Sequence, residues 1–227
     1  MQPYFFPYIG YFQLIGAVDL FIVYDNIKYT KKGWINRNRM LRNGKDVMFT
    51  LPLKSGSDSM DICERNLGAN FNCGKLLNQI REAYRRAPYF DRTFPLVEKI
   101  VRYEDANLFR FLHNSIVATC QYLGLVTEIR PSSEINIDHD LRNQDKVLAL
   151  CDAVGARSYI NAVGGFGLYS EEVFRNRGIE LRFIRPGSFE YAQFDHPFVP
   201  WLSIVDGMMF NSLATLKDCI NANYELI

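Results

Sequence analysis

The spacing of apolar residues in the first part of the chain predicts a helix followed by a strand. Apolar side chains recur at helical spacing over residues 8–17, and the uninterrupted apolar run 20–24 indicates a buried strand that a turn at Asp25 closes. A second strand is expected over residues 46–53, where Pro52 favours an edge position or a strand end. The chain therefore opens with an αβ unit.

The middle of the chain changes to a helical period. Residues 72–123 carry apolar side chains three and four positions apart, which is the spacing of one helix face. Pro88 separates the first two expected helices, and Gly124 is the expected C-cap of the third. This block is interpreted as a helical insertion of about residues 72–123.

Strands and helices then alternate regularly. The expected elements are strands at 126–129, 158–162 and 181–184, helices at 143–154 and 170–177, and a helical tail from residue 204. Such alternation is typical of a parallel sheet covered by helices. The sequence therefore predicts an α/β fold with a mostly parallel, Rossmann-like sheet flanked by helices, in a single domain spanning residues 1–227.

Composition and charge narrow the possible partners. The chain is 48% hydrophobic and 22% charged, with a formal net charge of +1, so it forms a substantial core but carries no global field for a polyanion. We expect no nucleic-acid partner. No run of about 18 apolar residues occurs, so no membrane insertion is expected. Five widely spaced cysteines without a CxxC pair favour reduced thiols in the cytoplasm.

The aromatic and proline-rich run at the N-terminus is the first candidate for function. Pro3 and Pro7 fit a rigid helix entrance, which is a purely structural interpretation. The functional interpretation is that Gly10 lets an anionic ligand approach the helix N-terminus, while Tyr4 and Tyr8 supply stacking walls for a base or sugar.

A basic segment follows the first expected strand and is the second candidate. Arg37 and Arg39 offer planar guanidinium groups suited to a diphosphate or carboxylate, whereas an exposed loop is the ordinary alternative. Trp34 and the amides of Asn36 and Asn38 lie among the basic residues, which favours a ligand site.

Three further features carry weaker signals. The glycine-rich loop at 164–167 matches neither GxGxxG nor a P-loop, so a tight turn is an equal alternative to phosphate binding. The three histidines lack metal-ligand spacing, so no metal site is predicted. Ser203 and Asp206 are three residues apart at an expected helix start, a spacing close to that of a capping box. A functional role for Asp206 would require its side chain to face the carboxyl ends of the strands.

Four segments together resemble the WbqC-like family, and the resemblance runs over nearly the whole chain. They are Gln2 to Phe12, Asp19 to Asp25, Gly33 to Arg39 and Leu202 to Asp206. The resemblance implies a place in bacterial surface polysaccharide loci, notably in lipopolysaccharide O-antigen synthesis. Family members usually carry a short apolar strand before the Gln-Pro-Tyr motif, whereas Gln2 here follows Met1 directly. That strand is therefore expected to be missing, or the start of the chain to lie downstream of the natural one.

A second resemblance concerns the nucleotidylyltransferase-type Rossmann-like proteins, whose first turn carries an HxGH motif. The corresponding tetrapeptide here runs from Tyr8 to Tyr11, with tyrosines in place of both histidines. Adenylylation through histidines is therefore not expected, although the helix start remains a candidate site for a nucleotide or a nucleotide sugar.

The leading hypothesis is a transferase of O-antigen biosynthesis that moves an acyl or aminoacyl group to a nucleotide-linked amino sugar. Asp25 or His196 is the candidate catalytic base. The substrate-binding candidates are Gln2, Tyr4, Tyr8, Gly10, Tyr11, Lys32, Trp34, Asn36, Arg37, Asn38, Arg39, Asn161, Gly164, Gly165, Tyr169, Ser203 and Asp206. The alternatives are a glycosyltransferase, for which no DxD-like motif is found, and a non-catalytic sugar-nucleotide-binding partner. The sequence names no cofactor and leaves the oligomeric state open.

Overall fold

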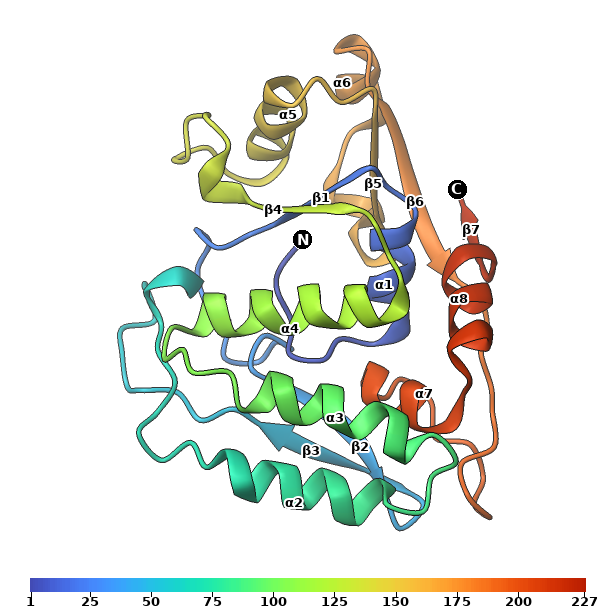
Figure 1. The fold of residues 1–227 in the computed structure, drawn as a ribbon. Coiled ribbons are helices and arrows are strands. Elements are labelled where there is room, and N and C mark those ends of the chain that lie inside the picture. The colour runs from blue at the N-terminus through green and yellow to red at the C-terminus, as the bar shows by residue number, and fades with distance from the viewer.

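The computed structural model describes all 227 residues, Met1 to Ile227, and has the α/β composition expected from the sequence (Figure 1). The elements in chain order are α1 (Ile9–Gly16), β1 (Leu20–Val23), β2 (Arg37–Arg42), β3 (Lys45–Thr50), η1 (Ile62–Glu64), α2 (Cys73–Tyr84), α3 (Phe90–Val101), α4 (Leu108–Leu123), β4 (Glu128–Pro131), η2 (Ser132–Glu134), α5 (Asn143–Ala153), β5 (Ser158–Ala162), η3 (Val163–Leu168), α6 (Glu171–Asn176), β6 (Glu180–Pro186), α7 (Ile204–Phe210), α8 (Leu213–Ala222) and β7 (Tyr224–Leu226).

The helical block expected over residues 72–123 is confirmed as α2, α3 and α4. Asn72 and Asn107 cap the first and third of these helices, each accepting a backbone N–H through its side chain. Gly124 ends α4 with a φ of +72°, the left-handed conformation that favours glycine. α4 is 16 residues long, and no helix is both long and apolar enough to cross a membrane.

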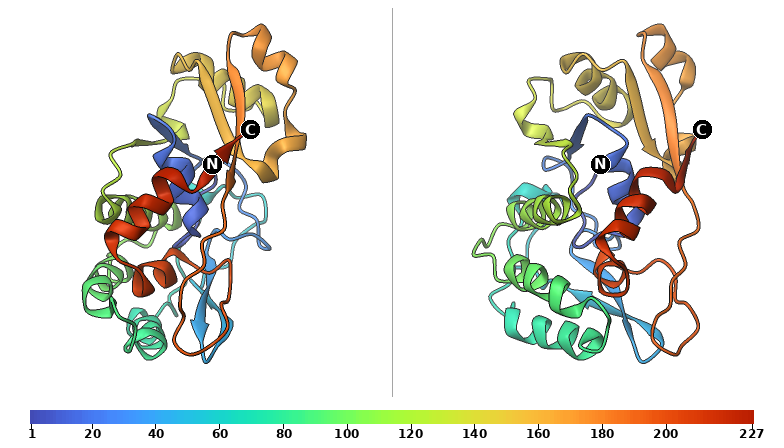
Figure 2. Two further views of the ribbon diagram at one scale, coloured as in Figure 1. Left: turned by 90° about the vertical axis from the view of Figure 1, so that its right-hand side faces the viewer. Right: turned by 45° about the vertical axis from the view of Figure 1, so that its right-hand side comes forward.

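The structure has no clear mostly parallel, Rossmann-like sheet, so this part of the predicted fold is corrected. The strands form three small sheets instead of one: β1 pairs with β4 in parallel, β2 pairs with β3 antiparallel, and β5, β6 and β7 form a mixed sheet. The first pair and β5 with β6 do have the parallel arrangement that the alternation implied. Figure 2 shows β7 beside β6, so the expected helical tail ends in a short strand.

The strand β2 was not foreseen, because its sequence, Arg-Asn-Arg-Met-Leu-Arg, reads as a basic loop. It forms a hairpin with β3 around a turn at Asn43 and Gly44, both of which have positive φ. Met40 and Leu41 are both buried, and their burial outweighs the poor β propensity of the charged neighbours. The basic segment is therefore partly a rigid strand.

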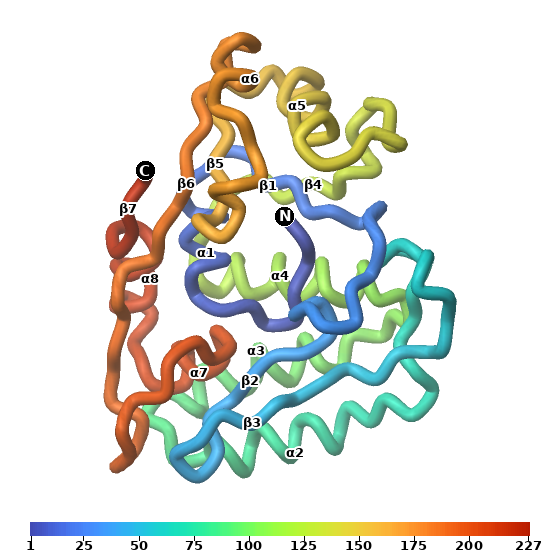
Figure 3. Tube along the Cα trace, turned by 180° about the vertical axis from the view of Figure 1, so that it is seen from behind, coloured from blue at the N-terminus to red at the C-terminus, as the bar shows by residue number.

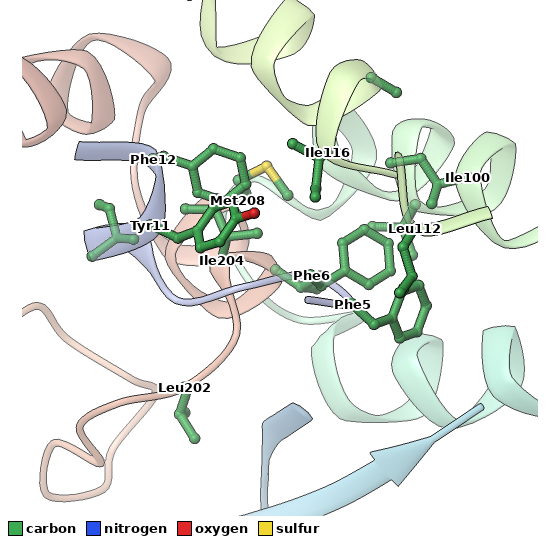
Figure 4. Close-up of a cluster of buried hydrophobic side chains, with 14 of the residues drawn as sticks. Phe5, Phe6, Tyr11, Phe12, Ile100, Leu112, Ile116, Leu202, Ile204 and Met208 are labelled. Carbon is green, nitrogen blue, oxygen red and sulfur yellow. The ribbon is translucent and has the colours of Figure 1, made fainter. Parts of the chain in front are cut away.

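The main core joins the N-terminal motif to the helical block and to α7. Phe5, Phe6 and Phe12 are completely buried in it, and Figure 4 shows Phe5 and Phe6 packed beside Leu112 of α4. A separate small cluster around Phe174 lies beneath α5 and α6. In Figure 3, α1 and α7 lie between the β5–β6 sheet and the helical block, so the N-terminal motif is at the junction of the two parts.

Asn38 of β2 holds the Phe5–Phe6 turn in place. Its amide Nδ2 donates to the carbonyl oxygens of Phe5 at 3.1 Å and Phe6 at 2.9 Å, and Phe6 adopts a φ of +44°. We expect Asn38→Ala to lower the free energy of unfolding by roughly 2–4 kcal/mol, because it leaves two buried carbonyls without a donor. Urea denaturation measures this loss. The exposed Asn78→Ala on α2 is the matched control and is expected to change stability by less than about 0.5 kcal/mol; equal losses would contradict the role of Asn38.

Candidate functional site

A cavity of about 430 Å³ opens at the N-terminal motif, and we call it the Arg39 cavity. Its lining residues come from five parts of the chain: the N-terminal motif, the start of α1, β2 with the segment before it, the end of β5, and the loop before α7. Its lining residues are Met1, Tyr4, Pro7, Tyr8, Gly10, Tyr11, Leu14, Trp34, Asn38, Arg39, Ala162 and Trp201. Seven of these, Tyr4, Tyr8, Gly10, Tyr11, Trp34, Asn38 and Arg39, are residues that the sequence predicted for substrate binding. The structure therefore brings together the first two candidate segments.

The beginning of α1 faces this cavity. Tyr8 is the N-cap and its side chain makes no capping hydrogen bond, so the first backbone N–H groups of the helix have no side-chain acceptor. No acidic residue occupies the first turn to neutralise the positive end of the helix dipole. The aromatic motif is itself well fixed, since Tyr11 donates its hydroxyl to the Gln2 carbonyl at 2.9 Å and packs on the Tyr4 ring.

Met1 lies beside β1 at the inner end of the same cavity. Its amino group donates to the Ile22 carbonyl at 2.7 Å, and its carbonyl accepts from the Tyr24 N–H at 2.9 Å. These two bonds fix Met1 beside β1.

Arg39 is the cation of the Arg39 cavity. Its guanidinium lies 5.4 Å from the Trp34 ring centre, pairs with Asp46 at 3.2 Å and donates to the Trp201 carbonyl at 2.9 Å. The Nε atom is buried and has no hydrogen-bond partner. An unpaired buried N–H is costly, so the position of Arg39 is held at some cost in stability.

Of the other polar residues of the basic segment, Asn38 also lines the cavity, whereas Lys32, Asn36 and Arg37 do not. The buried Asn36 accepts from Tyr29 and donates to the Leu51 carbonyl, so its amide is committed to the fold. Arg37 donates to the Gly33 carbonyl, and neither it nor the exposed Lys32 lines the cavity. Arg37 and Arg39 lie on the same side of β2, so the strand alone does not separate them; the Arg37 side chain is instead engaged by the Gly33 carbonyl.

A second cavity, of about 350 Å³, lies on the other side of Tyr8, and we call it the Glu190 cavity. It is lined by Tyr8, Ile9, Pro186, Gly187, Ser188, Phe189, Glu190, Tyr191, Phe198, Pro200, Trp201, Leu202, Ser203, Ile204 and Gly207. The sequence pointed to only two of these residues, Tyr8 and Ser203. The missed signal is compositional: residues 186–201 contain five aromatic residues and three prolines among sixteen.

Tyr8 and Trp201 form the wall that the two cavities share, with their ring centres 5.1 Å apart. Trp201 is 59% exposed and has a φ of +60°, which is a strained backbone conformation for a bulky residue. Strained conformations of this kind are concentrated at binding sites. A Cβ on Gly10 would lie 2.9 Å from Pro186 and 3.0 Å from the Tyr8 ring. The absence of a side chain at Gly10 therefore makes room for the Tyr8 ring and for Pro186.

Asp206 lies fully buried behind the Glu190 cavity. Its carboxylate accepts from the Tyr84 hydroxyl at 2.9 Å, the Tyr191 hydroxyl at 2.8 Å and Gln193 Nε2 at 2.7 Å. Burial raises the pKa of Asp206 to about 6, and the three donors oppose the rise. Ser203 caps α7 by accepting from the Val205 N–H, as the sequence predicted, but Asp206 does not complete a capping box.

The two candidate bases are not brought together. Asp25 is buried at the end of β1, where it accepts from Ser132 and from the backbone and hydroxyl of Ser133. His196 is exposed beside Gly44 at the β2–β3 turn. Neither residue lines the Arg39 cavity or the Glu190 cavity.

The glycine-rich loop forms η3 after β5. Asn161 donates to the Tyr169 hydroxyl at 3.1 Å, and Gly165 packs on the Asn161 amide, while Gly164 is open to solvent. Only the neighbouring Ala162 reaches the Arg39 cavity, so the loop contributes to its rim through one residue. No group of three or more His, Cys, Asp or Glu side chains is placed to hold a metal ion.

Comparison with known proteins agrees with these motifs. The family model of the WbqC-like proteins matches residues 2–218. The chain belongs to the WbqC-like protein family. An uncharacterized protein from Mycobacterium tuberculosis is 28% identical over 223 residues, which cover 96% of this chain and 94% of that protein. No solved structure matches.

In this WbqC-like protein the burial of Asp206 has a measurable consequence. Between pH 3.8 and about 6, Asp206 keeps its proton in the folded chain but has lost it in the unfolded chain. The free energy of unfolding should therefore fall as the pH rises through this window. We expect the stability advantage of the wild type over Asp206→Asn to shrink by about 2–3 kcal/mol across it, measured by urea denaturation at a series of pH values. The exposed Asp218→Asn is the control; a wild-type advantage independent of pH would refute the assigned shift.

Proposed function

We propose that the Arg39 cavity binds a nucleotide-linked amino sugar and that the protein is a transferase of bacterial lipopolysaccharide O-antigen biosynthesis. The observation that carries this proposal is the combination of aromatic walls, one arginine and an uncapped helix start around a cavity of about 430 Å³. This volume lies within the range of small-molecule sites. Membership of the WbqC-like family supports the same direction.

Each part of such a ligand has a suitable surface in the cavity. Tyr4 and Trp34 offer faces for stacking a base or sugar, which contributes about 1–3 kcal/mol per base. Arg39 and the N–H groups at the start of α1 suit the oxygens of a diphosphate. The pairing of Arg39 with Asp46 keeps its guanidinium oriented before the ligand arrives.

The reaction we propose is acyl or aminoacyl transfer from an activated acyl donor, such as a thioester, to the sugar amine. The amine nitrogen forms a bond to the carbonyl carbon, the bond from this carbon to the leaving group breaks, and the amine proton is released. The Tyr8–Trp201 wall separates two adjoining cavities, and a substrate that spans the wall would have both of its ends held in fixed positions, which favours reaction by proximity.

A second candidate function is non-catalytic binding of a sugar nucleotide on behalf of a neighbouring enzyme. The observation that favours it is that Asp25 and His196, the candidate bases, both lie outside the two cavities. Incubation with an amino-sugar nucleotide and acyl donors, followed by mass spectrometry of the sugar, separates the two functions. An acylated product supports the transferase, and saturable binding without product supports the binding protein.

Arg39→Gln should weaken the binding of a nucleoside diphosphate sugar about tenfold or more, because it removes a charge-assisted hydrogen bond to phosphate. Isothermal titration calorimetry with UDP-N-acetylglucosamine and the corresponding dTDP- and GDP-sugars measures the loss. Arg37→Gln, two residues away on the same strand and outside the cavity, is the matched control and should keep wild-type affinity.

Two results would contradict the proposed site. One is that no nucleotide sugar binds the wild type, and the other is that the Arg37 and Arg39 variants lose affinity equally. Thermal denaturation of both variants checks that the hydrogen bond from Arg39 to the Trp201 carbonyl is not needed for folding.

A further inference from the structure

The Glu190 cavity differs from its neighbour in charge. Among its fifteen lining residues, Glu190 is the one charged side chain, and no lysine, arginine or histidine lines it. The Arg39 cavity, by contrast, contains a guanidinium and no carboxylate. The two compartments on either side of the Tyr8–Trp201 wall therefore favour ligand groups of opposite charge.

Aromatic rings make up much of the surface of the Glu190 cavity. Tyr8 and Trp201 form one side with ring centres 5.1 Å apart, and Tyr191 lies 5.1 Å from Phe189 and 5.2 Å from Phe198. The face of an aromatic ring is negative and attracts a cation placed over it. A set of such rings around one carboxylate is the arrangement by which proteins recognise ammonium groups.

The hydroxyl group of Tyr191 agrees with this preference of the Glu190 cavity for a cation. Tyr191 donates its proton to Asp206, so its oxygen presents only lone pairs to a ligand. Asp206 itself lies directly behind Tyr191 and is ionised above its pKa of about 6.

We propose that the Glu190 cavity binds the ammonium group of an amine-bearing substrate. The carboxylate of Glu190 pairs with the cation, and the rings of Tyr8, Tyr191 and Trp201 surround it. The assignment of this amine as the acyl acceptor rests on the proposed function, in which the diphosphate of the same molecule lies in the Arg39 cavity. The binding preference for a cation rests on the Glu190 cavity alone.

The two tryptophans of the chain, Trp34 and Trp201, make the test direct. In a Trp34→Phe background the remaining Trp201 reports on the shared wall. Its fluorescence is titrated with glucosamine and with glucose, which differ by an ammonium in place of a hydroxyl. We expect glucosamine to bind about tenfold more tightly than glucose, and Glu190→Gln in the same background to reduce this preference to about twofold or less.

Glu82→Gln in the same background is the matched control, since this exposed glutamate of α2 carries the same charge and lies outside both cavities. It should leave the preference for glucosamine unchanged. The proposal is overturned if glucosamine gives no saturable signal, if glucose binds equally well, or if the preference survives in Glu190→Gln.

Failure of this inference is distinguishable from failure of the proposed function. Free glucosamine carries no phosphate and does not require Arg39, whereas nucleotide-sugar affinity is tested through Arg39→Gln. A preference for glucosamine without nucleotide-sugar binding would keep the ammonium site and remove the proposed function. Nucleotide-sugar binding without the preference would do the reverse.

Discussion

The hydrogen bonds from the Asn38 amide to the Phe5 and Phe6 carbonyls are the interaction on which the site depends. They hold a turn whose two phenylalanine rings are completely buried in the main core, while the following residues lead directly into α1. The Phe5 N–H of the same segment donates to the carbonyl of Ile35, just before β2, and the Pro7 carbonyl accepts from the Ile204 N–H of α7. The start of α1 is therefore fixed against a strand and a helix that are distant in sequence.

Around this fixed point the molecule builds two cavities that share a wall but differ in chemistry. On one side, Arg39 and the uncapped start of α1 favour an anion, and on the other, Glu190 and a set of aromatic rings favour a cation. Arg39 links the two sides, because it donates to the carbonyl of Trp201 and so positions the wall itself. A zwitterionic ligand that spans the wall would use both surfaces, and the nucleotide-linked amino sugar that we propose as substrate carries charges of both signs.

Asp206 shows how buried polarity connects the rest of the fold to this wall. Its carboxylate is bonded to Tyr84 of α2 and to Tyr191 and Gln193 of the loop before α7, and Tyr84 in turn accepts from the Leu41 N–H of β2. Removing a carboxylate that three donors share would leave each of them unpaired in a dry environment. This explains why a charged residue occupies a completely buried position at some cost in stability.

The sequence by itself determined the order and type of most elements, because apolar spacing records which face of a helix or strand is buried. The helices of residues 72–123 and the strand β1 followed from that pattern, while the aromatic and proline residues of the N-terminal motif marked it as a candidate site. Tertiary structure alone decided that the strands form three small sheets, that Arg37–Arg42 is a strand, and that Arg39 lines the cavity while Arg37 does not. It also decided that Asp25 and His196 lie apart from the cavities and that residues 186–201 complete the site. Periodicity reports local burial, whereas strand partners and cavity walls depend on contacts between segments far apart in the chain, which no local pattern encodes.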